Sequence, residues 1–234
     1  EGESLRERLE RSPLDIDEAS RLLSQVAEVL HRAHGADLLH RDIKPGNLFL
    51  VEMGYGLFVK LLDFGLAKQV KIPEDSHITR SGTTLGTAAY MSPEQIQSAR
   101  EIGPEGDLWA LAVTMYETLT GRLPFTGETS GGTMVKIATG NFKQVSKVRS
   151  DVPPGIDDWF RRALSKDSSE RFASAKAMSE AFDAALCDSP NADKQTHVAE
   201  SKPSPPLSSK RGLAQADTEE ISLETPVSDE ASSS

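Results

Sequence analysis

The chain has 234 residues, of which 37% are hydrophobic and 26% are charged, with a formal net charge of −10 and one cysteine. The length suffices for one domain with a sizeable core, and the low hydrophobic share indicates that part of the chain does not pack. The acidic balance argues against a nucleic-acid partner, no apolar run is long enough to span a membrane, and a single cysteine excludes an intrachain disulfide.

Residues 1–187 carry mainly helical patterns, so we expect a mainly α fold with a small β-hairpin. Asp15 and Glu18 have the spacing of a capping box, and apolar residues at helical spacing follow until Gly35, which favours the end of a helix. Two short apolar runs, at 48–51 and 58–62, are separated by glycines and predict the hairpin. Further helices are expected at about 107–120, 135–139, 156–165 and 173–186.

The last part of the chain, residues 188–234, has a different composition. It holds ten Ser, five Pro, nine acidic and four basic residues, and its large apolar residues are scattered. Such a stretch cannot bury enough apolar surface to offset the entropy lost on ordering. We therefore expect a folded domain at 1–187 and a disordered Ser/Pro-rich acidic tail or linker at 188–234. A helix across 212–223 is the less favoured alternative.

One segment carries the first chemical signal: His40-Arg41-Asp42-Ile43-Lys44-Pro45-Gly46-Asn47. It resembles the catalytic loop of the protein kinase family. Phosphoryl transfer mainly needs alignment and charge compensation. Asp42 can accept the proton of a substrate hydroxyl, Lys44 can offset charge on the transferred phosphoryl group, and Asn47 can bind Mg²⁺ through its amide oxygen. The resemblance implies that a lysine two residues after the aspartate marks serine/threonine kinases.

Two other residues of this segment are expected to support it. His40 is more consistent with packing under the loop than with a role as a base. An arginine beside the catalytic aspartate, Arg41, suits a site that receives a phosphate group. The capped-turn alternative for Asp42 and Asn47 is disfavoured by the motifs that follow.

The triplet Asp63-Phe64-Gly65 begins sixteen residues after Asn47, directly after the second predicted strand. It resembles the magnesium motif of the family. By that resemblance Asp63 would hold Mg²⁺ against the β- and γ-phosphates, and Phe64 would pack under the small lobe. Phe49, in the first predicted strand, would form part of the floor under adenine. The implied cofactors are ATP and Mg²⁺, with Mn²⁺ as a substitute.

A third segment, Gly86 to Glu94, resembles the end of a kinase activation segment, with Ser92 in place of the usual alanine. Thr87 would lie beside Asp42 and shape the substrate site, and Glu94 would pair with Arg171. Upstream of it, Thr83 and Thr84 are the expected sites of regulatory phosphorylation.

The fourth motif begins at Asp107 and resembles the central helix of the family's large lobe. The resemblance implies that Asp107 binds the backbone of the catalytic loop. The four motifs occur in the family's order and are similar to those of bacterial-type serine/threonine protein kinases. They imply the C-terminal, large lobe of the protein-kinase fold and transfer of the γ-phosphate of ATP to Ser or Thr hydroxyls of protein substrates.

No Gly-x-Gly-x-x-Gly loop precedes Asp42. We therefore expect a kinase domain truncated at its N-terminus, separated from its own small lobe and inactive by itself. A pseudokinase-like scaffold and a small-molecule phosphotransferase are the alternatives. The intact Asp42, Lys44, Asn47 and Asp63 argue against the first, and the activation segment argues against the second. The expected location is the cytoplasm, and a membrane anchor outside this span stays open.

Overall fold

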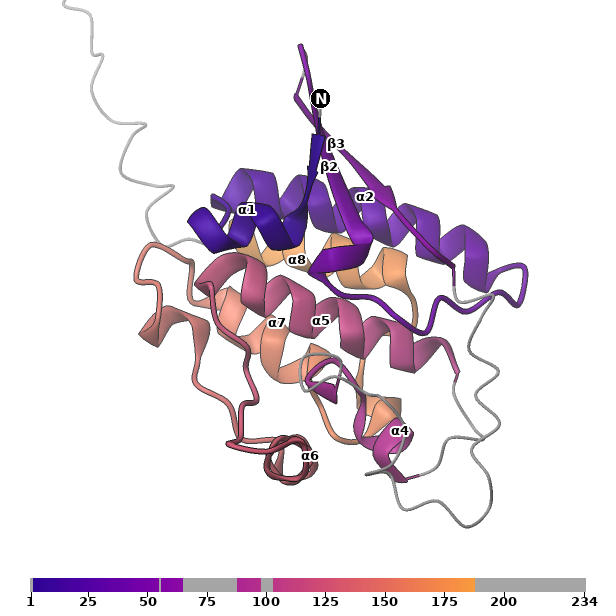
Figure 1. Ribbon diagram of the computed structural model, residues 1–234, viewed down its shortest axis with the longest axis vertical. Coiled ribbons are helices and arrows are strands. Elements are labelled where there is room, and N and C mark those ends of the chain that lie inside the picture. Colours follow the sequence, from indigo (N-terminus) through magenta and orange to yellow (C-terminus); the bar gives the residue numbers. More distant parts are fainter. Residues whose placement is uncertain (1, 55, 65–87, 98–102, 188–234) are drawn as a thin grey trace, which may run out of the picture. The chain divides into compact units, whose positions relative to one another are not determined.

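The computed structural model describes residues 2–54, 56–64, 88–97 and 103–187 (Figure 1). Helices dominate, and a three-stranded antiparallel sheet accompanies them, so the predicted fold class is confirmed. The strands are β1 (Gly2–Ser4), β2 (Leu48–Met53) and β3 (Gly56–Leu61), and the α-helices are α1 (Leu5–Arg11), α2 (Ile16–His34), α4 (Pro93–Gln97), α5 (Pro104–Thr120), α6 (Ser130–Thr139), α7 (Gly155–Ala163) and α8 (Ala175–Cys187). Three single-turn 3₁₀ helices are η1 (Pro45–Asn47), η2 (Val145–Lys147) and η3 (Ser168–Glu170).

The long helix α2 begins where its sequence predicts. The Asp15 side chain accepts a hydrogen bond from the Glu18 backbone, and the Glu18 side chain accepts one from the Asp15 backbone. At the other end Gly35 has a right-handed φ of −64°, and the left-handed residue is Asp37, with a φ of 55°. The glycine therefore ends the helix without the left-handed turn that is common at this position.

Helix α5 is the centre of the helical core. Every residue from Gly106 to Thr120 is buried, including the charged residues Asp107 and Glu117, which have hydrogen-bond partners. It packs against α2 and α7, while α8 packs against both α2 and α7 (Figure 1). Pro104 starts α5, and Gly121 ends it with a left-handed φ of 68°, a conformation that glycine adopts at low cost.

The sheet has the order β1-β2-β3, with Leu50 opposite Val59 on the face that packs toward the helices. Strand β3 lies at an edge, where backbone groups need another partner. Helix α2 supplies it: the Gln25 side chain donates to Leu57 O at 2.9 Å and accepts from Val59 N at 2.9 Å. One amide side chain thus replaces a neighbouring strand.

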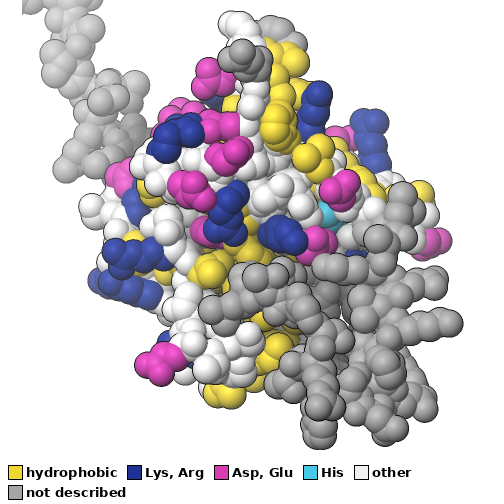
Figure 2. Space-filling model, in the orientation of Figure 1, with side chains coloured by type: hydrophobic (Ala, Val, Ile, Leu, Met, Phe, Trp, Pro, Cys, Tyr) yellow, Lys and Arg dark blue, Asp and Glu magenta, His cyan; other side chains and the backbone are white. Residues whose placement is uncertain are grey.

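The opposite face of the hairpin is apolar and partly exposed. Met53 is 37% exposed and Phe58 is 42% exposed, and Figure 2 shows hydrophobic side chains along the projecting hairpin. Elsewhere on the face shown, acidic and basic side chains are interspersed (Figure 2). None of the helices described is both long and apolar enough to cross a membrane.

Three local predictions need correction. The segments 2–4 and 5–11 form β1 and α1, which the sequence reasoning did not anticipate, so the hairpin has a third strand. Helix α6 begins at Ser130, not near Val135, because the Thr129 side chain caps it by accepting from Gly132 N. Helix α5 begins at Pro104, three residues before the predicted start.

Candidate active site

Three polar side chains meet at the turn that leads into β2. The Lys44 ammonium donates to both carboxylate oxygens of Asp42, at 3.0 and 2.8 Å. The Asn47 amide nitrogen donates to the Asp42 backbone oxygen at 2.7 Å and to its Oδ2 at 3.1 Å. All three side chains are partly buried. The carboxylate orientation is therefore fixed by a cation and an amide within the same turn.

A buried carboxylate on α5 holds the backbone that precedes this turn. Asp107 is 1% exposed; its Oδ2 accepts from His40 N at 2.8 Å and its Oδ1 from Arg41 N at 2.7 Å. His34, at the end of α2, places its Nε2 2.9 Å from Asp107 Oδ2. Arg41 has a left-handed φ of 66°, an uncommon conformation for a residue other than glycine. The loop is thus tied directly to the central helix.

The ring of His40 joins the turn to the end of β3. Its Nδ1 accepts from Asp42 N at 3.3 Å, so its Nε2 carries the proton and donates to Leu62 O at 2.9 Å. The Phe64 ring meets the His40 ring edge-on, with centroids 4.9 Å apart. Leu62 N also donates to Asn47 O at 2.8 Å, which brings the two predicted motifs together. Phe64, expected to pack under a small lobe, is half-buried against His40.

The residues expected to bind a metal have suitable chemistry. With its amide nitrogen bound to Asp42, Asn47 keeps its amide oxygen as an acceptor. Asp63 is exposed, has a left-handed φ of 55°, and follows Leu62, the residue that bonds to Asn47. Amide and carboxylate oxygens suit Mg²⁺, which usually completes its shell with water and substrate phosphates. Among the described residues, no cluster of three His, Cys, Asp or Glu side chains is arranged to hold a metal.

Glu94 and Arg171, which sequence reasoning paired, lie together. The Arg171 guanidinium donates to both carboxylate oxygens of Glu94, at 2.7 and 2.8 Å, and the Arg171 side chain is fully buried. Partial burial by itself would raise the pKa of Glu94. Together, the hydrogen bonds and charge of Arg171, the Glu94 backbone and Ser92 outweigh that effect and hold the pKa of Glu94 below its ordinary value.

The remaining site predictions have different outcomes. Phe49 lies half-buried in β2, on the face opposite Leu50. Thr83, Thr84 and Thr87 lie outside the described residues, as does the predicted tail at 188–234.

Comparisons with known proteins agree with this geometry. The family described as "Protein kinase domain" matches residues 1–182. The chain belongs to the protein kinase family. Serine/threonine-protein kinase PknL of Mycobacterium tuberculosis is 38% identical over 179 residues, which are 76% of this chain and 43% of that protein. Serine/threonine-protein kinase pkn3 of Myxococcus xanthus is 38% identical over 181 residues, which are 75% of this chain and 33% of that protein.

Two solved structures share the kinase fold. The kinase domain of M. tuberculosis PknI, as a C20A_R136A double mutant, aligns with a TM-score of 0.58 and 23% identity, over 80% of this chain and 63% of that one. Rad53 1-466 in complex with AMP-PNP aligns with a TM-score of 0.60 and 25% identity, over 76% and 43%. The resemblance to bacterial-type serine/threonine kinases is confirmed, and the chain spans less than half the length of PknL and of pkn3. The family generally uses ATP and Mg²⁺.

Sequence reasoning missed two sets of residues in this kinase lobe. It assigned no role to His34, and it overlooked Arg6, Tyr90 and Glu117, which form a hydrogen-bonded network between α1, the turn before α4 and α5. No local pattern signals either set, because each depends on contacts between segments far apart in the chain. The capping-box spacing of Ser4 and Glu7 would, however, have revealed the helix that carries Arg6.

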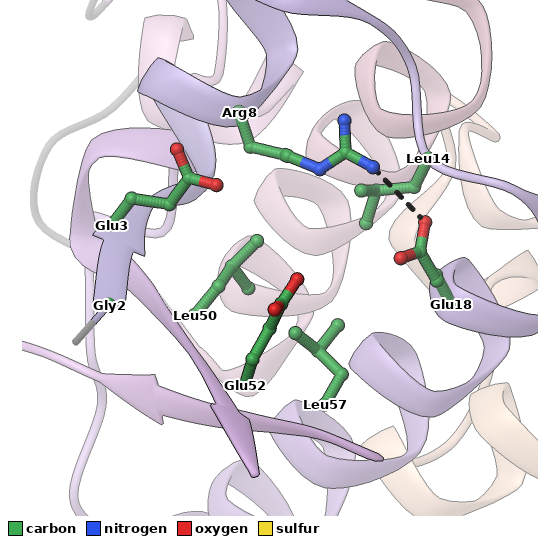
Figure 3. Close-up of a pocket in the computed structure, with 8 residues that line it drawn as sticks. All are labelled: Gly2, Glu3, Arg8, Leu14, Glu18, Leu50, Glu52 and Leu57. Carbon is green, nitrogen blue, oxygen red and sulfur yellow. Dashed lines mark ion pairs between the residues drawn. The ribbon is translucent and has the colours of Figure 1, made fainter. Parts of the chain in front are cut away.

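A cavity of about 260 Å³ lies between the sheet, α1 and α2 (Figure 3). Leu50, Glu52 and Leu57 line its wall on the inner face of the hairpin, and the ion pair between Arg8 and Glu18 spans it at 3.6 Å. None of the residues predicted to act in phosphotransfer lines it. The cavity therefore lies on the opposite face of the sheet from Phe49 and is separate from the candidate active site.

Proposed function

We propose that this lobe serves a serine/threonine protein kinase that transfers the γ-phosphate of ATP to Ser or Thr hydroxyls of protein substrates. The observation that carries the proposal is the fixed carboxylate of Asp42, held by Lys44 and Asn47 within one turn. A carboxylate so oriented can align an acceptor hydroxyl and take its proton. The names of the relatives, serine/threonine-protein kinases, support the acceptor class.

Each residue has one task in the proposed reaction. Asp42 accepts the hydroxyl proton as the acceptor oxygen approaches phosphorus in line. Lys44, which already contacts that carboxylate, lies where it can offset charge on the transferred group. Asn47 and Asp63 would hold Mg²⁺, which supplies charge neutralisation at the phosphates when bound. Thr87 belongs to the proposed acceptor side, and Thr83 and Thr84 remain the proposed regulatory phosphorylation sites.

The outer face of the hairpin suits the nucleotide base. Phe49 lies there among other partly exposed apolar residues, and apolar surfaces of this kind accept a planar ring. The Rad53 structure is a complex with AMP-PNP, which supports a nucleotide as the ligand. In this proposal, contacts to the phosphates from a glycine-rich loop and a strand lysine come from the kinase's own small lobe, outside these 234 residues. We further propose that the large lobe occupies 1–187.

The test is Asp42→Asn in the native protein that contains this chain. Because Asp42 acts on the acceptor hydroxyl, turnover should fall by about 10²-fold or more, while ATP affinity stays within about twofold. Asp37→Asn is the matched control, because it makes the same chemical change at an exposed residue. The backbone of Asp37 is left-handed, a conformation that Asn tolerates. Wild-type turnover in Asp42→Asn would overturn the assignment of Asp42. A wild-type protein that shows no turnover itself would favour a scaffold.

A further inference from the structure

The cavity between the sheet, α1 and α2 lies outside the proposed phosphotransfer site, and its lining is partly apolar and partly charged (Figure 3). Its apolar walls come from Leu14, Leu50 and Leu57. Leu14 is 1% exposed and Leu50 is 4% exposed, so these walls are fixed by the core. A concave apolar surface with a few polar groups is typical of sites that bind small ligands.

Most of the charged groups in this lining already have partners. Arg11, from outside the cavity, donates to both carboxylate oxygens of Glu3, at 2.6 and 2.5 Å. Arg8 pairs with Glu18 at 3.6 Å. The remaining acid of the lining, Glu52, has no side-chain hydrogen bond or ion pair among the described residues. One negative charge in the cavity is therefore left uncompensated by this part of the chain.

The position of Glu52 places that charge beside apolar surface. Glu52 lies two residues after Leu50 on β2, so both side chains are on the inner face of the hairpin, and its partner on β3 is Leu57. Figure 3 shows the Glu52 carboxylate between these two leucines, turned toward the cavity. Glu52 is exposed, so a ligand can reach it without local unfolding. One ligand can therefore meet the carboxylate and the leucines at the same time.

We propose that this cavity binds an organic cation: a primary ammonium or guanidinium group on a short hydrocarbon stem. The cation donates to the Glu52 carboxylate, and the stem packs on Leu50 and Leu57. The volume of about 260 Å³ is below that of most pockets for drug-sized ligands, so the group that enters is small. A metal ion fits less well, because the described residues hold no cluster of three His, Cys, Asp or Glu side chains arranged for one.

The same chemistry occurs in a free alkylamine and in the lysine side chain of another protein. The experiment therefore titrates two cations into the native protein that contains this chain: n-butylamine, which is protonated at neutral pH, and N-acetyl-lysine N-methylamide, which carries the same butylammonium group on a peptide backbone. n-Butanol is the neutral probe with the same stem. Binding is followed by NMR of ¹³C-labelled leucine and valine methyl groups, a readout that does not depend on phosphotransfer.

Glu52→Gln is the test variant, and its fold is not at risk because Glu52 is exposed and unpaired in the described structure. Glu10→Gln is the matched control, because it makes the same change at an exposed residue of α1 that does not line the cavity. Val135, which is 64% exposed on α6, reports non-specific binding to apolar surface.

n-Butylamine should shift the methyl signals of Leu14, Leu50 and Leu57 to saturation and leave those of Val135 unchanged. Glu52→Gln should weaken this binding by about tenfold or more, and n-butanol should bind wild type more weakly by a similar factor. Glu10→Gln should stay within about twofold of wild type. n-Propylamine should bind about fourfold more weakly than n-butylamine, because it buries one methylene fewer. If the capped lysine binds as tightly as n-butylamine, the ligand is a side chain of a partner protein, and weaker binding identifies a free amine.

Three results would overturn the inference. Equal affinity for n-butanol and n-butylamine would show that the charge has no role. Unchanged affinity in Glu52→Gln, or an equal loss in Glu10→Gln, would remove Glu52 from the site. Shifts that do not saturate, or that extend to Val135, would show non-specific association. Because none of these measurements needs transferase activity, failure of the proposed function would leave the inference untouched, and the reverse also holds.

Discussion

Replacing Arg171 with alanine should be among the most destabilising single changes in this lobe. Its side chain is fully buried and donates to both oxygens of Glu94. It also donates to Ser165 O at 2.8 Å and to Glu105 O at 3.1 Å, and its guanidinium lies 4.9 Å from the ring centroid of Trp109. Alanine removes every one of these contacts and leaves an unfilled volume beside the tryptophan.

The magnitude follows from these contacts. Breaking a buried ion pair by removing one partner costs about 3–5 kcal/mol, so Arg171→Ala should lower the free energy of unfolding by that amount. Glu94→Gln should cost less, because the side chain of Glu94 is 28% exposed and glutamine can still accept one hydrogen bond. In the double variant the losses should fall short of their sum by about 0.5–3 kcal/mol.

Urea unfolding followed by tryptophan fluorescence measures these differences. The matched control is Arg161→Ala, which breaks a pair with Asp158 whose side chains are 64% and 72% exposed. Such pairs contribute about 0–1 kcal/mol. If Arg171→Ala proved no more destabilising than Arg161→Ala, or if the double-variant losses were simply additive, the buried pair of Glu94 and Arg171 would not stabilise the fold as argued from its contacts.

The same pair should give the lobe an acid-sensitive stability. Because the pKa of Glu94 is lowered in the folded protein, the unfolded chain binds the proton first as the pH falls. The stabilisation is therefore complete above the ordinary pKa of 4.5 and is lost as the pH falls through the folded value. Glu94→Gln should flatten this part of the pH profile of unfolding, and an unchanged profile would contradict the assignment.

Three further predictions concern stability. Trp109→Phe should lower the free energy of unfolding, measured by calorimetry, by about 1 kcal/mol or more less than Trp159→Phe does. In the described structure the buried Nε1 of Trp109 has no hydrogen-bond partner, whereas the Nε1 of Trp159 donates to a backbone oxygen at 2.9 Å. Gln25→Ala should cost about 1–3 kcal/mol in urea unfolding, since it leaves two backbone groups of β3 unpaired. Burial and an acidic neighbour raise the pKa of Tyr90, so the unfolded chain loses this proton first as the pH rises above 10.0. The free energy of unfolding of wild type should therefore fall by up to about 1.4 kcal/mol per pH unit, and that of Tyr90→Phe should fall less.

Local sequence signals predicted the elements that depend on local physics. The capping box of Asp15 and Glu18 and the apolar repeat after it fix the start of α2. Glycine-flanked apolar runs predicted β2 and β3, although β1 was missed, because three residues carry no periodicity that could be recognised. The predicted helix at 135–139 was shorter than α6, because the first turn of α6 contains Gly131 and Gly132, which are poor helix formers.

The chemical groups of the site were readable from the sequence, but their arrangement was not. The motif that contains Asp42 and Asn47 resembles a catalytic loop, and the same resemblance paired Glu94 with Arg171. Nothing in the spacing shows that Asn47 bonds to the backbone of Asp42, or that His34 approaches the same carboxylate as the loop backbone. Contacts of this kind depend on where α2 and α5 lie, which tertiary packing decides.

The position of Asp42 also depends on the backbone of Arg41, where conformational strain opposes hydrogen bonding to Asp107. A left-handed residue other than glycine costs about 1–2 kcal/mol, and Arg41 has a φ of 66°. Asp107 accepts from the backbone of both His40 and Arg41, and hydrogen bonds to a charged group contribute about 1.5–3 kcal/mol each. The gain exceeds the strain, so the conformation persists. Because Asp107 is buried in α5, the core itself holds the backbone that orients Asp42. A change far from the turn that shifts this helix should therefore impair the phosphotransfer proposed for Asp42.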